Sequence, residues 1–269
     1  MQGQGRVADP MGPQIFHGQW MAAEYVPDLV SVIVPTFNRA NLIIRALESA
    51  RRQTYRPIEV IVVDDGSTDN TSEMVTAWIA KLLPSDALDV SLLRQPNSGG
   101  PAARNRGLVA SRGEFIQFLD SDDIVHPEKI QSQRGRLVEE GADFTWSPMM
   151  VVRTDVRIAD FDYYANQAGI LFFDRAGDYI PEQVGVGLYR RDLCRRMGPW
   201  DETLTTRQDW DYRYRCEALA PSTCFLPRTY YCVLAHSEGR VNDHYFTQTD
   251  VVSMLKALKN AQGYSHASG

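Results

Sequence analysis

Asp120, Asp122 and Asp123 place three carboxylates within four positions, and no basic residue lies among them. Carboxylates this close repel one another, so the cluster favours either raised pKa values or a bound cation. Two carboxylates at positions i and i+2 suit Mg²⁺ or Mn²⁺, which take few protein ligands and complete their shell with phosphate oxygens and water. The same residues are also typical of an Asx turn that caps the next helix. Taken alone, the cluster leaves both interpretations open.

A second acidic pair and a glycine-rich segment suit the recognition of a nucleotide. Asp64 and Asp65 follow a run of β-branched residues, where a carboxylate can accept a hydrogen bond from a nucleobase N–H or a ribose hydroxyl. Asp-Gly is also a common turn pair. Residues 97–101 (NSGGP) precede a predicted helix that carries Arg104, and helix N-termini bind anions. Such a segment is usually only a connector, and its position between the two acidic loops is what favours a role in binding.

Short apolar runs alternate with amphipathic segments and predict the elements that carry these residues. Strands are predicted at 31–35, 58–63, 90–93 and 114–119, and helices at 39–53, 70–81 and 102–111. Asn70 is expected to cap its helix, with Glu73 at the capping-box position. Short apolar strands separated by helices predict a mostly parallel α/β sheet covered on both faces.

Three of the four predicted strands end in polar clusters, Thr36-Phe37-Asn38, Asp64-Asp65 and Asp120-Ser121-Asp122. In open α/β sheets a ligand binds beyond the carboxyl ends of the strands. The three clusters are therefore expected to meet in one crevice.

Four segments carry a family resemblance: VSVIVPTFNR (30–39), VIVVDDGSTDNT (60–71), NSGGPAARNRG (97–107) and FIQFLDSDD (115–123). Each has little specificity alone, but together and in this order they resemble the inverting family 2 glycosyltransferases. The resemblance covers roughly residues 30–240. It implies the GT-A nucleotide-diphospho-sugar transferase fold, a doubly wound, mostly parallel α/β sheet with a smaller mixed subsheet on the acceptor side.

The resemblance also implies roles for matching residues around a nucleotide. The candidate nucleotide-binding residues are Pro35, Thr36, Phe37, Arg39, Asp65, Gly100, Arg104, Asp120 and Ser121. Phe37 is expected near the base, and Asp65 is expected to accept a hydrogen bond from the base N3–H of uracil. Asp120-Ser121-Asp122 matches the DxD motif of the family, which places Asp120 near the ribose and sugar and Asp122 on a metal ion, Mn²⁺ or Mg²⁺.

After about residue 140 the pattern loosens, and it predicts strands at 144–152, 186–189 and 229–234 and helices at 207–218 and 247–259. We expect a loosely ordered lead-in at 1–28, a glycosyltransferase domain at 29–246, and a C-terminal helix and tail at 247–269. Within the domain, 29–125 would be the nucleotide-binding half and 126–246 the acceptor and catalytic half.

Further matches to the family lie in the second half of the chain. Gln208-Asp209 takes the place of a Glu-Asp pair that opens a helix, and the resemblance makes Asp209 the general base for the acceptor hydroxyl. Without the family, a carboxylate in the first turn of a helix is explained by the helix dipole. Gln208 departs from the usual Glu, which bears on the acceptor contacts and on activity. His236 follows the strand at 229–234, where relatives place a second metal or diphosphate ligand.

Four arginines precede these matches, and they suit either an anionic acceptor or a solvated helix face: Arg190, Arg191, Arg195 and Arg196. The four cysteines are expected to be reduced core thiols, since no CxxC pair occurs: Cys194, Cys216, Cys224 and Cys232.

Composition excludes several classes of protein. The formal net charge of −6 argues against a nucleic-acid binder, which needs an excess of Lys and Arg. No apolar run approaches the roughly 20 residues that span a bilayer, and the first residues lack the apolar core of a signal peptide. We expect a cytoplasmic protein without a transmembrane segment. Peripheral association with the inner face of the membrane, through a partner or a lipid acceptor, is left open.

The predicted activity is metal-dependent, inverting transfer of a sugar from a nucleotide diphosphate, expected to be UDP from the resemblance around Asp65. The acceptor would be a hydroxyl group of a glycan, a lipid-linked glycan or a small molecule. An inactive nucleotide-sugar-binding module is the main alternative, and Gln208 is the residue that favours it. A nucleotidyltransferase is the second alternative, although such enzymes carry a Gly-rich basic loop after the first strand, where this chain has Pro35-Thr36-Phe37-Asn38-Arg39.

Overall fold

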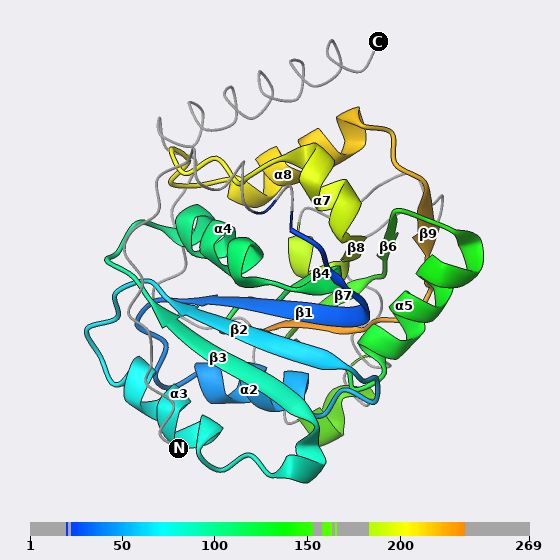
Figure 1. The fold of residues 1–269 in the computed structure, drawn as a ribbon. Coiled ribbons are helices and arrows are strands. Elements are labelled where there is room, and N and C mark those ends of the chain that lie inside the picture. Colours follow the sequence, from blue (N-terminus) through cyan, green and yellow to red (C-terminus); the bar gives the residue numbers. More distant parts are fainter. Residues whose placement is uncertain (1–19, 21–22, 153–157, 163–164, 166–182, 235–269) are drawn as a thin grey trace.

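The central element is a seven-stranded sheet with the strand order β3-β2-β1-β4-β8-β6-β9 (Figure 1). The computed structural model describes residues 20, 23–152, 158–162, 165 and 183–234. The strands of this sheet are β1 Val26–Thr36, β2 Ile58–Asp64, β3 Leu88–Arg94, β4 Gly113–Phe118, β6 Phe144–Trp146, β8 Leu188–Arg190 and β9 Thr223–Phe225. β3, β2, β1 and β4 run parallel, and β8 is antiparallel to both β4 and β6. β6 and β9 are parallel to each other.

A second sheet of three strands has the order β5-β10-β7. These strands are β5 Ile124–Val125, β7 Met149–Val152 and β10 Tyr231–Leu234, with β10 parallel to β7 and antiparallel to β5. β5 follows the acidic cluster directly, so this small sheet fixes the far side of that loop.

Helices cover both faces of the central sheet (Figure 1). α4 Gly100–Ala110 packs on β1 and β2, with α7 Arg191–Met197 and α8 Gln208–Ala218 on the same side. α2 Ile43–Arg51 and α3 Thr71–Ile79 lie on the opposite side, and α5 Lys129–Glu140 packs against β6, β8 and β9. Three 3₁₀ turns complete the described elements: η1 Pro84–Asp86, η2 Ile158–Asp160 and η3 Val184–Val186. The predicted doubly wound, mostly parallel α/β sheet with a smaller mixed sheet is confirmed.

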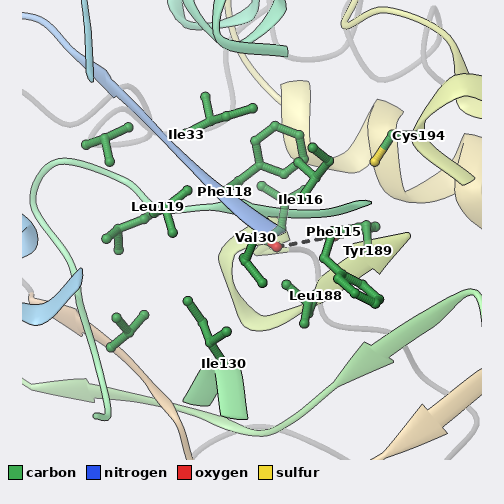
Figure 2. Close-up of a cluster of buried hydrophobic side chains, with 14 of the residues drawn as sticks. Val30, Ile33, Phe115, Ile116, Phe118, Leu119, Ile130, Leu188, Tyr189 and Cys194 are labelled. Carbon is green, nitrogen blue, oxygen red and sulfur yellow. Dashed lines mark hydrogen bonds between the residues drawn. The ribbon is translucent and has the colours of Figure 1, made fainter. Parts of the chain in front are cut away.

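The apolar strands are buried on both faces, which is why they lack the alternation of a half-exposed sheet. Every residue of β2 is buried, as is β1 from Leu29 to Val34. Figure 2 shows side chains of β1, β4, α5, β8 and α7 meeting in one core, among them Val30, Phe118 and Ile130. This continuous core fixes the carboxyl ends of β1, β2 and β4 relative to one another.

Several predicted boundaries are corrected. The helix predicted at 39–53 begins only at Ile43, because the preceding residues form turns. The strand predicted at 144–152 is two strands in different sheets, because Ser147 and Pro148 interrupt the ladder. The strand predicted at 186–189 begins only at Leu188 as β8, because the chain just before it forms the turn η3.

The capping prediction for α3 is confirmed in position but not in its hydrogen bond. Asn70 stands at the N-cap position, but its side chain makes no capping hydrogen bond. Asp69 takes that role, because its Oδ1 accepts from the Thr71 N–H at 3.0 Å and its Oδ2 accepts from the Ala40 N–H at 3.2 Å. One carboxylate therefore ends the loop after β1 and begins α3.

α5, α7, β5 and β9 lie outside the sequence prediction. All four cysteines are buried and free, as expected, and burial raises the pKa of Cys194 to about 12. Residues 1–19 and 21–22 of the predicted lead-in and the helix predicted at 247–259 lie outside the described residues, so the domain boundaries stay predictions. Within the lead-in, Trp20 is buried and β1 already begins at Val26.

Gly107 lets α4 approach β1, and this contact gives a stability prediction. A Cβ at Gly107 would lie 2.4 Å from Ile33 Cγ2, so Gly107→Ala is expected to lower the free energy of unfolding by about 1–3 kcal/mol. A Cβ at Gly135 in α5 would have no atom within 4 Å, and Gly135→Ala is expected to raise the free energy of unfolding by about 0.5–1 kcal/mol. Urea unfolding of both variants checks the pair, and equal effects would contradict the packing described here.

Candidate active site

The polar clusters that end β1, β2 and β4 lie along one edge of the sheet, as expected. The Asp65 N–H donates to the Thr36 carbonyl at 2.8 Å, which continues the β1–β2 ladder into the first two clusters. Arg39 Nε lies 3.7 Å from Asp122 Oδ2, which joins the first cluster to the third. These contacts bring the three clusters to one edge of the sheet, and the predicted crevice between them stays a prediction.

The loop after β1 presents an aromatic ring at this edge. Phe37 is 41% exposed although it lies between two residues with fixed backbones. Asn38 has a left-handed backbone (φ 51°), and its N–H donates to Ser67 Oγ at 2.9 Å. The Asn38 side-chain oxygen accepts from the Thr68 N–H at 2.8 Å. Phe37 is thus held at the surface by its neighbours, in a place where a flat base can stack on it.

Pro35 and Thr36 are the last two residues of β1 and lead directly into this loop. The Thr36 side chain is 3% exposed, and its hydroxyl is among the buried polar atoms of the described residues that lack a hydrogen-bond partner. Buried polar groups are nearly always satisfied, so an unpaired hydroxyl at this edge is consistent with a ligand atom binding there. The predicted base-pocket wall of Pro35, Thr36 and Phe37 stays a prediction.

Asp65 holds the glycine-rich loop. Its Oδ1 accepts from Gln95 Nε2 at 2.7 Å and from the Ser98 N–H at 2.9 Å, and its Oδ2 accepts from the Gly99 N–H at 2.7 Å. Burial raises the pKa of Asp65, and these hydrogen bonds only partly offset that effect. In this structure the carboxylate therefore positions the start of α4, and its predicted contact with a base N3–H stays a prediction.

Arg104 joins three parts of the site. Its Nη2 donates to Asp120 Oδ1 at 2.8 Å and lies 3.9 Å from Asp209 Oδ1, while its Nη1 donates to Gln208 Oε1 at 3.0 Å. Burial lowers the pKa of Arg104, but the charges of Asp120 and Asp209 outweigh burial and leave the pKa raised. A permanently charged group thus bridges the acidic loop and the first turn of α8.

Trp200 supports this guanidinium from its other face. The Arg104 Cζ lies 4.7 Å from the Trp200 ring centroid, and the Trp200 ring stacks on Tyr212 at 4.1 Å with an interplanar angle of 2°. The Asn105 side chain binds both the N–H and the carbonyl of Trp200, at 2.8 and 3.0 Å. A cation held against an indole in a desolvated site is stabilised by about 2 kcal/mol or more.

Gly100 allows the Arg104 and Gln208 side chains to meet. A Cβ at Gly100 would lie 3.0 Å from both Arg104 Nη1 and Gln208 Oε1, which is tighter than ordinary contact. The predicted nucleotide-binding Gly100 therefore also makes room for the bond between Arg104 and Gln208.

The three carboxylates of the acidic loop have different environments. Asp123 is buried, and burial together with the charges of Asp122 and Asp120 raises its pKa well above the usual value. Tyr231 Oη and the Leu234 N–H donate to it at 2.8 and 3.2 Å, so Asp123 ties the loop to β10. Ser121 is 5% exposed and lies between the carboxylates.

Asp120 and Asp122 are the carboxylates that face the edge of the sheet. Asp120 Oδ2 accepts from Gln183 Nε2 at 3.1 Å, opposite its bond to Arg104. The Asp122 side chain is 18% exposed and lies beside Arg39. No sequence signal singled out Gln183 or Tyr231, because their contacts with the loop depend on tertiary packing.

The donor set fits a hard divalent cation that is held through few protein ligands. In the part of the chain described, no three His, Cys, Asp or Glu side chains converge on one point. Asp122 supplies hard carboxylate oxygens that suit Mg²⁺ or Mn²⁺, and such an ion completes its shell with phosphate oxygens and water. His236, the other candidate ligand, lies outside the described residues.

The four arginines singled out in the sequence each contact other residues of the chain. Arg191 is 1% exposed and its Nε donates to the Gly113 carbonyl at 2.6 Å, so the solvated-face interpretation is wrong for this residue. Arg190 pairs with Glu114 at 2.9 Å, Arg195 with Asp192 at 3.1 Å and Arg196 with Asp143 at 2.9 Å. The contacts of Arg190 and Arg191 bind β8 and α7 to the core, whereas the Arg195–Asp192 pair lies within α7.

Comparison with known proteins decides the family. The family model for "Glycosyl transferase family 2" matches residues 31–194. The chain belongs to glycosyltransferase family 2. The matched range begins within β1 and ends within α7, so it covers every predicted nucleotide-binding residue from Pro35 to Ser121 and the predicted metal ligand Asp122.

Relatives support the same assignment over part of their length. The "Glycosyltransferase GlyG" of Streptococcus pneumoniae is 33% identical over 175 residues, which is 64% of this chain and 52% of GlyG. The chain thus matches about half of that relative, so the activity of the whole relative does not transfer with the likeness.

Solved structures confirm the GT-A fold. Staphylococcus aureus TarS 1–349 in complex with UDP-GlcNAc has a TM-score of 0.67 at 23% identity, over 86% of this chain and 66% of TarS. The mannosyltransferase PcManGT from Pyrobaculum calidifontis, in complex with GDP-Man and Mn²⁺, has a TM-score of 0.60 at 18% identity, over 96% of this chain and 83% of PcManGT. Among the described residues of this chain, no helix has the length and apolar character to cross a bilayer.

The Arg104 bridge leads to a stability prediction. Arg104→Lys keeps the charge but loses the planar fork that serves Asp120 and Gln208 together, so the free energy of unfolding is expected to fall by about 1.5–3 kcal/mol. Arg106→Lys on the same helix is the control, since Arg106 Nη1 donates to the Arg94 carbonyl at an exposed position. Urea unfolding that finds the two variants equally stable would contradict the bridging role.

Proposed function

We propose that the chain transfers a sugar, with inversion, from a nucleotide diphosphate to a hydroxyl acceptor. The observation that carries this proposal is the position of Arg104, whose Nη2 lies 2.8 Å from Asp120 and 3.9 Å from Asp209. One side chain thus contacts both the DxD loop that would hold the donor and the carboxylate that would activate the acceptor. A donor bound at the edge of the sheet would therefore have a base beside it.

The donor would lie across the ends of β1, β2 and β4. Its base would stack on Phe37 and meet Asp65, and its diphosphate would lie between the N-terminus of α4 and the acidic loop. The first N–H groups of a helix and the helix dipole favour phosphate at that position. Gly100, Arg104, Asp120 and Ser121 would contact the ribose and the phosphates, and Arg39 would orient Asp122.

A divalent cation, Mn²⁺ or Mg²⁺, would be held by Asp122, with His236 as the second candidate ligand. When bound, such an ion neutralises the charge that develops on a leaving diphosphate. The residue types at the edge of the sheet are consistent with this role, because Asp122 offers oxygen ligands in a loop that carries an excess of negative charge.

Asp209 would act as the general base. The acceptor hydroxyl would transfer its proton to the Asp209 carboxylate as the oxygen attacks the anomeric carbon. The bond from that carbon to the diphosphate oxygen would break, and its electron pair would leave with the diphosphate. Attack from the face opposite the leaving group inverts the anomeric carbon.

Gln208 bears on whether the site retains this chemistry. Its amide oxygen accepts from Arg104, which is a bond that a glutamate could also accept. Compared with a glutamate, the Gln208 amide gives Arg104 one fewer negatively charged partner. Asp209 keeps its place in the first turn of α8. Its replacement of Glu changes the charge beside the acceptor without removing the base.

The nucleotide, the acceptor and the location of the protein complete the proposal. The resemblance around Asp65 favours UDP, although the two structural neighbours named above bind UDP-GlcNAc and GDP-Man respectively. The acceptor would be the hydroxyl of a glycan, of a lipid-linked glycan or of a small molecule. We place the protein in the cytoplasm, where a lipid-linked acceptor would bring it to the inner face of the membrane.

Binding of a nucleotide diphosphate tests the donor site. UDP, GDP and dTDP would be titrated with and without Mn²⁺, and one of them is expected to bind in a manganese-dependent manner. Because binding stabilises the folded state, that nucleotide at 100 times its Kd is expected to raise the free energy of unfolding by about 2.7 kcal/mol. Calorimetric titration and thermal unfolding measure the two effects.

Asp122→Ala is expected to abolish the manganese dependence, while Asp192→Ala on α7 serves as the control because its carboxylate pairs with Arg195 away from the sheet edge. Failure of all three nucleotides to bind, with or without the metal, would overturn the donor site. Manganese-dependent binding without any sugar transfer would leave a nucleotide-sugar-binding module instead.

A further inference from the structure

Lys129 at the start of α5 is fully buried, and its partners in the described structure are neutral. Its Nζ donates to Gln117 Oε1 at 2.5 Å, to Gln133 Oε1 at 2.6 Å and to the Gly187 carbonyl at 3.3 Å. Burial holds the pKa of Lys129 well below its usual value. Burying an amine costs free energy unless its hydrogen bonds are satisfied, and these three acceptors satisfy them.

The two glutamines that bind Lys129 also donate hydrogen bonds to the backbone of η3. Gln117 Nε2 donates to the Gly185 carbonyl and Gln133 Nε2 donates to the Val186 carbonyl, both at 2.8 Å. Together with the bond from Lys129 to Gly187, the lysine–glutamine cluster (Lys129, Gln117 and Gln133) binds the carbonyls of three successive residues. The backbone of η3 is therefore fixed from the side of α5 and β4.

Packing fixes η3 from its other side as well. A Cβ at Gly185 would lie 2.3 Å from the Tyr231 ring, and one at Gly187 would lie 2.1 Å from the Phe144 ring. Tyr189 Oη donates to the Val184 carbonyl at 3.2 Å. Only glycine allows the chain to pass this close to two rings, so η3 has little freedom to move.

Gln183 is the residue that η3 holds in place. It is the N-cap of η3, and its Oε1 accepts from the Gly185 N–H at 3.4 Å. Its Nε2 donates to Asp120 Oδ2 at 3.1 Å and to Asp123 Oδ2 at 3.3 Å. One amide nitrogen therefore spans two carboxylates of the acidic loop, on the side opposite Arg104.

We propose that Gln183 is a positioning residue that sets the geometry of the acidic loop without adding a positive charge to it. The inference rests on the proposed donor site. Two carboxylates that share a donor are held at a fixed separation despite their repulsion. A lysine or arginine at this position would bind them more strongly, but it would neutralise the loop and disfavour a bound cation. A neutral amide holds the two carboxylates together and does not neutralise the loop.

The test measures the Mn²⁺ concentration that gives half-maximal nucleotide binding, with whichever of UDP, GDP and dTDP the wild type binds. Gln183→Ala is expected to raise this concentration roughly tenfold to a hundredfold, which corresponds to losing a hydrogen bond to a charged group. Gln183→Lys is expected to raise it as well, although the lysine restores a donor. Gln131→Ala is the matched control, because this glutamine lies on the exposed face of α5, where it accepts from Thr54 Oγ1.

Thermal unfolding without ligand shows that each variant is folded, and Gln183→Lys keeps the test decisive if Gln183→Ala fails to fold. A wild-type manganese dependence in Gln183→Ala, or its full restoration in Gln183→Lys, would overturn the inference and leave the donor site standing. Absence of manganese-dependent binding in the wild type would instead overturn the donor site itself, and the inference with it.

Discussion

A single buried guanidinium connects the two halves of the candidate active site. Arg104 enters from α4, pairs with Asp120 at the end of β4, and reaches Gln208 and Asp209 at the start of α8. Breaking a buried pair by removing one partner costs about 3–5 kcal/mol, because a charge is left without compensation. The Trp200 ring against the guanidinium and the missing side chain at Gly100 hold that charge in place.

The acidic loop is held by groups of different charge on its different sides. Arg104 binds Asp120 from the side of α4, the neutral Gln183 binds it from the side of η3, and Tyr231 fixes Asp123 to β10. Asp122 is the carboxylate of this loop that stands beside Arg39 at the edge of the sheet. Each of the three carboxylates is therefore held by a different part of the fold, and Asp122 is the one that the loop after β1 reaches.

Sequence patterns predicted the first half of the molecule well, because its strands are continuous apolar runs whose polar ends mark one edge of the sheet. They failed where the chain depends on distant partners. β9 and β5 are too short to carry a period, and the polar helix α5 hides the buried Lys129 behind an exposed face. Gln183 had no local signal at all, since its role comes from residues about 60 positions away in sequence. The family resemblance rested on the order of four motifs in the first half of the chain, so errors in the second half did not affect it.

The central claim is that Arg104 joins a donor site to a separate base, Asp209. Asp209→Asn tests this separation most directly. This change keeps the shape of the side chain, so manganese-dependent nucleotide binding should stay within about twofold of the wild type. Turnover of the bound nucleotide sugar should fall by about 10²–10⁴, the usual contribution of a general base. Binding and turnover would be measured on the same preparation. Turnover that persists in Asp209→Asn, or binding that disappears with it, would contradict the separation of donor site and base described here.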